Sequence, residues 1–592
     1  MIRRCTLLLL IFCALLFPHQ VRASNFIADY NVDYAIAPNG SSIVTQKISL
    51  TNQFTNLYPK QYEVTIDTTN INNIIAYDNK GMITPKIDQK DGKTEIILQF
   101  NDKVVGLGKT LSFELRYEQG DIAEKHGNIW EVNIPGIEND PTIGTYTVEI
   151  RTPPNFGPVA YMKPEPASGR KWIKNQMVDG GISAAYGNKQ EYIAELSYDL
   201  ENTKLTRALY EIALPPDTPF QQIQIRSIEP KPIETKLDAD GNWMATYSLE
   251  GSQKMRVVAK LAIATFVKPR QDFKSNDIIP TDYLSVQQFW ETEDPGIKKI
   301  ASQYKTPREI FDFVTATLSY NFERTKEMYK RYGAKETLKN PKDALCSEFT
   351  DLFVALARAS GIPAREAVGY AFTTNTQLRP TTNYGDILHS WPEYYNSAQK
   401  QWIPVDPTWA KTTKGIDYFD ILDFNHIAFV LHGVSSDYPY PAGSFKQGSI
   451  PKKNVSVQFS EKAIQTEAQS LKTTITIPSK IMLGSILEGS VSVQNTSGTS
   501  VNDVLISIYA EPFIFTSSKK EPYIPPYGTV TIPLTIHTTG LIPKEKGKVT
   551  VTTNADVTTQ YFTLTPRWTL LAPIALVILG FLLFLWTIFK KR

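Results

Sequence analysis

The stretch DALCSEFTDLFVALARASGIPAR, residues 343–365, decides how the chain is interpreted. Apolar side chains recur in it at helical spacing, and they predict a helix over residues 344–360 with Asp343 as its N-cap and Gly361 as its stop. Cys346 then lies in the first helical turn. Unpaired N–H groups and the helix dipole at that end favour a thiolate, the form of cysteine that attacks carbonyl carbon.

The apolar side of this helix indicates where the thiol points. Phe349, Leu352, Phe353 and Leu356 share the side that carries Cys346, so we expect this side to pack against the rest of the domain. The thiol would then face a cleft at the helix start. A buried and inert cysteine is the alternative, and it is the better interpretation if Cys346 stands alone, because free cysteine is commonly buried.

Two further residues supply what a reactive thiol needs. His389 lies in LHSWPEYY, residues 388–395, and Asp406 lies in WIPVDPTW, residues 402–409. We expect both on strands, and the short polar link between the two runs suits a hairpin that sets the strands side by side. An imidazole activates a thiol, and a carboxylate holds the imidazole in the required tautomer.

Four motifs in this order resemble the transglutaminase-like superfamily: ALCSEF (344–349), LARASGIPAR (356–365), HSWPE (389–393) and DPTW (406–409). The resemblance covers about residues 280–435. It implies a papain-like α+β core with the cysteine at a helix N-terminus and the other two residues on adjacent strands. It also implies Cys346 as nucleophile, His389 as base and Asp406 as the orienting carboxylate. The family includes acyltransferases, peptidases, amidases and a few inactive members.

Other polar residues near these motifs have weaker claims. His426 and His432 could line the cleft, but we interpret them as structural histidines. Glu348 and Glu393 are polar neighbours and not acid–base candidates, because cysteine acyl transfer needs no second carboxylate. Arg358 and Arg365 are expected to make structural hydrogen bonds rather than to bind substrate. Trp391 shields the site or belongs to the core.

Acyl transfer also needs donors for the developing oxyanion. The backbone N–H of Cys346 at a helix start is a natural first donor. Tyr320 or Asn321, at the end of the preceding helical segment, is our candidate for the second.

Around the motifs, residues 275–443 are predicted to form the catalytic α+β domain. Helical periods precede the cysteine at residues 283–289, 295–304 and 307–318, the last with Pro307 in its first turn. Residues 444–471 are predicted to be a linker with at most one short helix.

Both flanks of this domain alternate like β-sheet proteins. Residues 24–270 predict an N-terminal β-sandwich region, as one domain or two subdomains. The run Asp238-Ala239-Asp240-Gly241-Asn242 fits a hairpin turn better than a calcium loop. Residues 472–564 predict an immunoglobulin-like β domain.

The two ends predict export and anchoring. Residues 1–23 have the basic start, apolar run and small-residue end of a signal peptide. Residues 568–589 form an apolar run long enough to cross a bilayer, with Trp568 and Trp586 near its ends and the basic tail 590–592 after it. We predict a single-pass cell-membrane protein with its catalytic domain outside the cytoplasm.

Composition narrows the possible partners. There are 62 basic and 60 acidic residues, a formal charge of +2, so no basic surface for nucleic acid is predicted. Cys5 and Cys13 lie in the predicted signal peptide, which leaves Cys346 as the one thiol of the mature chain. No metal or cofactor motif is found, and the oligomeric state cannot be predicted.

We therefore predict a cysteine enzyme that acts on a protein or peptide substrate through a thioester on Cys346. A peptidase or amidase is favoured slightly over a protein-glutamine acyltransferase. The alternative is a catalytically idle surface protein whose β domains bind a partner while the enzyme fold serves as a scaffold.

Overall fold

The computed structural model describes residues 25–590 except 179, 274–280, 327–329, 382–387, 414–415, 420, 446–452, 466–469, 544–545 and 555. The predicted signal peptide and the last two residues of the basic tail lie outside this part. The chain divides into two compact units, of which the first comprises Met1–Lys125, Trp130–Gly157 and Met162–Ala184. The second comprises His126–Ile129, Pro158–Tyr161 and Ala185–Arg592. The division near residue 184 falls inside the predicted region 24–270.

The first unit is almost entirely β structure, as its alternating sequence predicts. A seven-stranded sheet has the order β13-β11-β1-β2-β8-β4-β5, and a three-stranded sheet has the order β3-β7-β6. The strands of these two sheets are β1 (Phe26–Ile36), β2 (Ser42–Asn52), β3 (Gln61–Ile66), β4 (Ile71–Asp78), β5 (Gly81–Ile83), β6 (Lys86–Lys90), β7 (Lys93–Gln99), β8 (Thr110–Gln119), β11 (Ile143–Arg151) and β13 (Lys171–Ile173).

Further short elements occur between residues 123 and 186. They are the strands β9 (Ala123–His126), β10 (Ile129–Ile134), β12 (Val159–Lys163) and β14 (Ile182–Tyr186), the 3-10 turn η1 (Pro154–Phe156) and the short helix α2 (Lys174–Met177).

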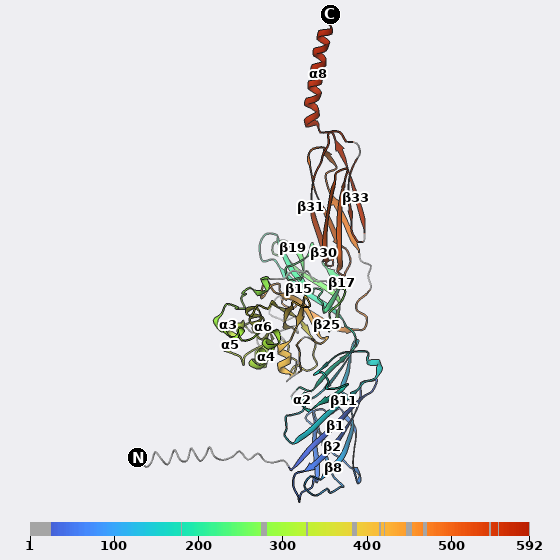
Figure 1. Cartoon of the computed structure of the whole chain (residues 1–592), viewed down its shortest axis with the longest axis vertical. Helices are drawn as coiled ribbons and strands as arrows, with labels where there is room; N and C mark the ends of the chain where they lie inside the picture. The colour runs from blue at the N-terminus through green and yellow to red at the C-terminus, as the bar shows by residue number, and fades with distance from the viewer. Residues whose placement is uncertain are drawn as a thin grey trace, which may run out of the picture. The chain divides into compact units, whose positions relative to one another are not determined.

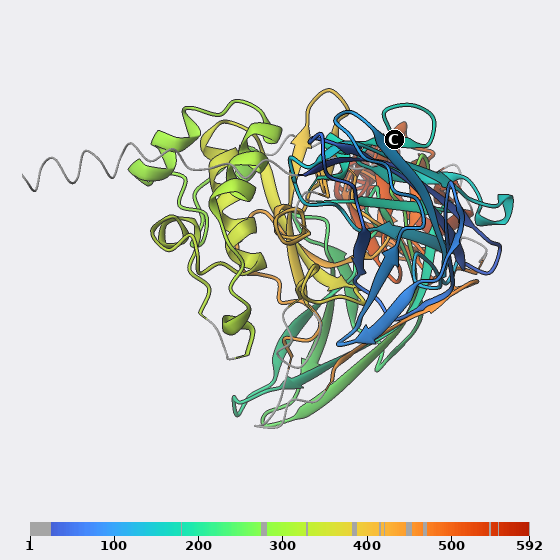
Figure 2. The same ribbon diagram turned by 90° about the horizontal axis from the view of Figure 1, so that it is seen from below.

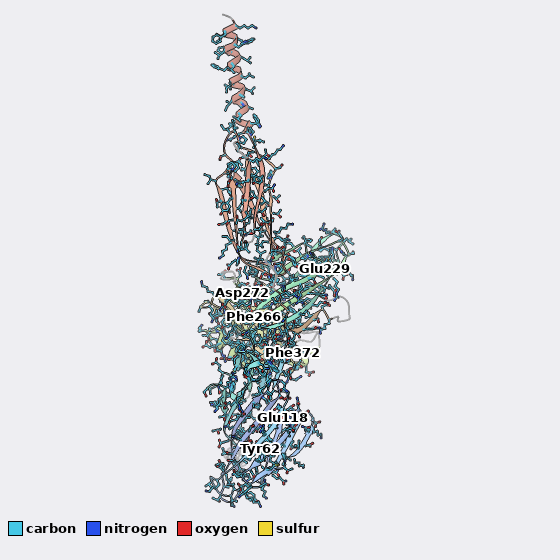
Figure 3. The ribbon with its side chains drawn as sticks, turned by 90° about the vertical axis from the view of Figure 1, so that its right-hand side faces the viewer. Tyr62, Glu118, Glu229, Phe266, Asp272 and Phe372 are labelled. Atoms are coloured by element: carbon cyan, nitrogen blue, oxygen red, sulfur yellow. The ribbon has the colours of Figure 1, made fainter. Side chains whose placement is uncertain are left out.

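The second unit begins with a two-sheet β domain. Its strands are β15 (Gln190–Glu201), β16 (Ala208–Leu214), β17 (Gln221–Glu229), β18 (Glu234–Leu237), β19 (Trp243–Leu249) and β20 (Lys254–Thr265). The predicted hairpin turn at residues 238–242 is confirmed, because it joins the paired strands β18 and β19. Figure 3 labels Phe266 and Asp272, which follow β20; Arg270 lies over the Phe266 ring and pairs with Asp272.

One strand of this β domain comes from far along the chain. β25 (Val455–Ser460) pairs with β15, with Leu196 opposite Val455, and completes the sheet β17-β20-β15-β25. The prediction that residues 444–471 contain only a linker and at most a helix is therefore wrong at this point. The run Val455-Ser456-Val457-Gln458-Phe459 alternates, and its apolar residues contact the core of the β domain.

The α+β domain that follows carries the motif residues. Its helices are α3 (Pro295–Ala301), α4 (Pro307–Thr317), α5 (Ala334–Lys339), α6 (Cys346–Ala359) and α7 (Pro407–Thr412). Pro307 occupies the first turn of α4 as predicted, and the Thr306 side chain caps that helix. Residues 283–289 are not the predicted helix: only the 3-10 turn η2 (Thr281–Leu284) forms there, and the turn η3 (Phe322–Lys326) follows α4.

A four-stranded sheet lies against these helices. It contains β21 (Ala364–Ala371), β22 (His389–Asn396), β23 (Gln401–Pro404) and β24 (His426–His432), in the order β23-β22-β21-β24. Figure 2 shows the helices together on one side of the strands. Gly369 of β21 permits the close approach of β24, because a Cβ there would lie 1.9 Å from the Ile427 carbonyl oxygen.

The C-terminal part of the second unit is a two-sheet β domain joined to a long helix (Figure 1). The sheets have the orders β26-β28-β31 and β27-β33-β32-β29-β30, and residues of both form one core. Their strands are β26 (Leu471–Thr476), β27 (Lys480–Met482), β28 (Ile486–Asn495), β29 (Val501–Glu511), β30 (Phe515–Ile524), β31 (Thr529–His537), β32 (Gly547–Thr552) and β33 (Val557–Thr565). Helix α8 (Trp568–Lys590) is long and apolar enough to cross a membrane.

Candidate active site

The predicted nucleophile opens the central helix of the α+β domain. Cys346 is the first residue of α6, and its side chain is buried with 2% exposure. The helix is buried on all sides from Cys346 to Arg358, whereas the sequence predicted one packed side. A helix surrounded by protein can hold its first residue at a fixed position relative to the sheet.

The predicted N-cap is wrong. The helix begins two residues later than predicted, and Leu345 occupies the cap position without a capping side chain. Glu348 takes over this function, because its carboxylate accepts a hydrogen bond of 2.9 Å from the Leu345 N–H. The Asp343 carboxylate instead accepts hydrogen bonds from Asn321 and Tyr332.

The predicted base lies at the start of β22. His389 pairs with Gly369 in the neighbouring β21, and its imidazole is fully buried. The predicted hairpin between β22 and β23 is present, with Tyr394 opposite Ile403. The prediction that His389 lies on a strand is therefore confirmed.

Asp406 lies just beyond a strand rather than on one. It follows β23 by two residues and is the N-cap of α7, where its Oδ1 accepts from the N–H groups of Thr408 and Trp409 at 2.9 and 3.0 Å. Its Oδ2 accepts from His389 Nε2 at 3.0 Å. The run Asp-Pro-Thr-Trp contains the signal, because a capping aspartate followed by proline typically begins a helix.

The charge state of this pair follows from its surroundings. Burial lowers the pKa of His389, but the Asp406 carboxylate and a hydrogen bond with Cys346 outweigh burial and raise that pKa to about 10. Burial favours protonation of Asp406, yet His389 and His426 hold the pKa of this carboxyl well below its usual range. The arrangement therefore stabilises an imidazolium between a carboxylate and a thiol.

The two ring nitrogens of His389 have different surroundings. Nε2 bonds to Asp406, while Nδ1 has no nitrogen or oxygen partner among the described residues. Nδ1 is therefore the nitrogen available to the Cys346 thiol. This order of thiol, imidazole and carboxylate can remove a proton from sulfur and later return it to a leaving group.

A second histidine and a second aspartate extend the network, and our sequence analysis missed their connection to it. His426 Nε2 lies 3.4 Å from Asp406 Oδ2, and His426 Nδ1 bonds to Asp423 at 2.8 Å. Burial lowers the pKa of His426, but Asp423 and Asp406 raise it above its ordinary value. We expected a structural histidine here, whereas the ring contacts the candidate active site directly. The spacing of Asp423 and His426 was a signal for their own pair, but not for its contact with Asp406.

Two tryptophans surround the histidines. Trp409 stacks on His389 with ring centres 5.2 Å apart, and Trp391 stacks on it at 6.0 Å. Trp391 also meets His426 edge to face at 5.0 Å. These rings keep water from the imidazole–carboxylate pair, which strengthens its electrostatic interaction.

The structure supports the candidate oxyanion donors to different degrees. The backbone N–H of Cys346 is at the first helical position, where no intrahelical acceptor exists. Asn321 is a poor second donor, because its side-chain amide donates to Asp343 at 2.6 Å and its backbone N–H to Ala344. Tyr320 lies beside Ala344, close to the helix start, and remains a candidate.

The other polar residues have structural partners, as we predicted. Arg358 donates to the backbone oxygens of Ser285, Ala364 and Gly433, and Arg365 pairs with Glu393 at 2.7 Å. Both ring nitrogens of His432 are engaged, one with Glu366 and one with the Pro439 carbonyl.

One group of side chains in the described residues could offer metal ligands. The ligand atoms of His389, Asp406 and His426 all lie within 4.8 Å of one another. The same atoms, however, already join His389 to Asp406 by a hydrogen bond and His426 to Asp406 at 3.4 Å. An ion would have to replace these contacts, so the donor set fits an acid–base network better than a metal centre.

Comparison with known proteins gives one family match and several similar solved structures. Residues 292–407 match the model of the transglutaminase-like superfamily. Similar solved structures include a proposed cysteine protease from Cytophaga hutchinsonii, with 16% identity, 46% of this chain and 98% of that chain covered, and a TM-score of 0.27. The periplasmic domain of TgpA from Pseudomonas aeruginosa has 13% identity, coverage of 39% and 92%, and a TM-score of 0.22.

A further similar solved structure covers a smaller share of the chain. The CARDB domain of a Pyrococcus furiosus protein has 15% identity, covers 18% of this chain and 95% of its own length, and has a TM-score of 0.15. No curated protein matches the chain in sequence.

Proposed function

We propose that this chain, which carries a transglutaminase-like domain, is an extracytoplasmic cysteine enzyme acting on amide or peptide carbonyls. The observation that carries the proposal is the buried series Cys346, His389 and Asp406, with a 3.0 Å bond from the imidazole to the carboxylate. The family match supports a cysteine enzyme in general terms.

The reaction would proceed through a thioester. The Cys346 thiolate attacks the carbonyl carbon while the backbone N–H at the start of α6 donates to the developing oxyanion. The His389 imidazolium gives its proton to the leaving amine, and a C–S bond replaces the C–N bond. Water or a second amine then attacks the thioester, His389 accepts the proton of that nucleophile, and sulfur leaves as the thiolate, which restores the thiolate–imidazolium pair.

Asp406 would hold the imidazole in position throughout. One of its oxygens is fixed by the N–H groups at the start of α7, so the other stays directed at His389 Nε2. His426 and Asp423 would position Asp406 from the other side, since His426 approaches the same carboxylate oxygen.

Hydrolysis of peptide or amide bonds is our favoured outcome over transfer to an amine. The full-length protein in lipid nanodiscs should be incubated with a glutamine peptide and a lysine peptide, with Cys346→Ser as the control. Peptide cleavage, or release of ammonia with no isopeptide product, supports hydrolysis, and an isopeptide product supports acyl transfer. No Cys346-dependent product across a diverse peptide library would contradict the enzymatic proposal.

We further propose that α8 anchors the chain in the cell membrane with its Lys590 end in the cytoplasm. The basic residues after the apolar run support this orientation, because the cytoplasmic flanks of membrane helices carry an excess of lysine and arginine. Protease added to intact cells should then digest the catalytic domain. If the domain is protected until the membrane is disrupted, the proposed orientation is wrong.

A further inference from the structure

The C-terminal β domain connects to the apolar helix almost directly. β33 ends at Thr565 and α8 begins at Trp568, so only Pro566 and Arg567 lie between them. Two residues span about 7 Å at most. If α8 spans a membrane, as proposed above, the end of the domain next to α8 must lie at the membrane surface at any tilt of the helix.

Strand register identifies the loops at this end. Gly547 of β32 is opposite Phe562, near the end of β33, and Lys548 is opposite Glu511, the last residue of β29. The loop 512–514 after β29 and residues 538–543 before β32 therefore lie beside the start of α8. The Arg567 N–H donates to the Leu541 carbonyl oxygen at 2.8 Å, which joins the second loop to the residue preceding the helix.

The residues at the tips of these loops are apolar and exposed. Ile514 is fully exposed, and Leu541 and Ile542 are exposed by 45% and 66%. Single exposed apolar residues are common on protein surfaces, but these three share the one end of the domain from which an apolar helix leaves. Trp568, the first residue of that helix, is exposed beside them.

Cationic residues accompany the apolar tips. Arg567 lies between β33 and α8, and its side chain packs over Gly484 in the loop after β27. Lys546 is exposed in the loop that carries Leu541 and Ile542. Apolar side chains flanked by basic ones suit the boundary between acyl chains and anionic headgroups.

We propose that the loops 512–514 and 538–543 insert Ile514, Leu541 and Ile542 into the interfacial layer of the lipid bilayer. This inference rests on the membrane anchoring proposed above, but not on the catalytic proposal. The C-terminal domain would then be seated on the bilayer at three points, two loops and α8, rather than attached by the helix alone. Arg567 and Lys546 would face lipid phosphates.

Spin labels can measure the depth of each loop in the full-length protein in nanodiscs containing anionic lipid. Cysteine would be introduced at Ile542, Ile514 or Val557, each in a Cys346→Ser chain, and the Cys346→Ser parent would give the labelling background. Val557 is the matched control: it is 62% exposed, like Ile542 at 66%, but begins β33 at the opposite end of the domain. Accessibility to oxygen and to a water-soluble nickel complex reports depth.

Labels at Ile542 and Ile514 should lie about 5 to 10 Å below the headgroup boundary, with the label at Val557 in water. Labels in water at all three positions would overturn the seating, provided the protein resists extraction by alkaline carbonate. Protection of Ile542 from both oxygen and nickel would indicate a second protein copy instead of lipid and would also overturn it. Carbonate extraction of the chain would contradict the anchoring proposal itself.

Discussion

Two of the buried histidine–carboxylate pairs described in the α+β domain, His389–Asp406 and His432–Glu366, differ in one decisive respect. His389 bonds to Asp406 at 3.0 Å, and His432 bonds to Glu366 at 2.9 Å. The second nitrogen of His432 is occupied by the Pro439 carbonyl. The second nitrogen of His389 has no nitrogen or oxygen partner in the described structure and is left for the Cys346 thiol.

The carboxylates of the two pairs differ as well. Glu366 is neutralised by Arg331, whose guanidinium also pairs with Asp351 in the core. Burial acts to raise the pKa of Glu366, but Arg331 and then His432 lower it. Asp406 contacts histidines and backbone N–H groups instead. A buried imidazole–carboxylate pair can thus be structural or reactive. It can be reactive when the second imidazole nitrogen is left for a thiol and when no arginine neutralises the carboxylate.

Replacing His389 should give the largest effect. We expect His389→Ala to lower turnover, measured with a peptide that the wild type converts, by about 10²- to 10⁴-fold. The thiol would lose its proton acceptor, and the leaving amine would lose its proton donor. Steady-state kinetics in nanodiscs measures the loss. His432→Ala is the matched control. If it lost as much turnover per folded molecule as His389→Ala, the two pairs would not differ in function as we propose.

Asp406→Asn should lower turnover by at least about 10²-fold and change its pH dependence. In the wild type the imidazolium persists until the pH rises through about 10. Without the carboxylate, burial dominates and lowers the pKa of His389, so the high-pH limb of the rate profile should move to lower pH. An unchanged limb would show that Asp406 does not set the charge of His389.

The same pKa shifts predict how stability varies with pH. The raised pKa of His389 contributes stability that is complete below the ordinary histidine pKa and is lost as pH rises through about 10. The lowered pKa of Asp406 contributes stability that is present above its ordinary value and is lost in acid. Chemical denaturation of the wild type should show a decline toward pH 10, and the same decline in Asp406→Asn would contradict this assignment.

Glu366→Gln should act on stability rather than on the reaction. We expect it to lower the free energy of unfolding by about 3 kcal/mol, because Arg331 loses one of two buried anionic partners. Denaturant titration gives the stability, and alkylation of Cys346 gives the reactivity of the folded fraction. A large fall in that reactivity would mean that the two pairs are coupled.

Among the three variants of the active-site network, His426→Gln should have the smallest effect on the rate. We expect about a tenfold loss of turnover, which corresponds to the free energy of one of the weaker hydrogen bonds to a charged group. The loss stays small because Asp406 keeps its two backbone donors. The high-pH limb should move far less than in Asp406→Asn. If the two variants shift the limb equally, His426 controls the charge of the network as well as its position.

The sequence allowed the elements of the site to be predicted, but not their connections. The long amphipathic run around Cys346 and the hairpin after His389 were correctly predicted, because both depend on local periodicity and turn chemistry. The N-cap was misassigned because Asp343 and Glu348 are both suitable capping residues, and tertiary contacts with Asn321 and Tyr332 decide between them.

Long-range pairings could not be predicted in the same way. The sequence of β25 is short and lies in a polar connector, so it does not predict a strand by itself. Only its pairing with β15, more than 250 residues earlier in the chain, shows that it belongs to a sheet. His426 begins β24 and Asp406 follows β23, the two edge strands of the sheet β23-β22-β21-β24, yet their side chains approach to 3.4 Å. Nothing in the local pattern of either residue specifies that neighbour.

The rate at which an electrophilic amide probe alkylates Cys346, measured across pH, tests the central claim most directly. Full-length wild type, His389→Ala and His432→Ala should be compared in nanodiscs, with intact mass to confirm a single adduct. We predict rapid labelling near neutral pH in the wild type and His432→Ala, and labelling only at alkaline pH in His389→Ala. Identical profiles for all three proteins would contradict an imidazole-activated thiol at this site.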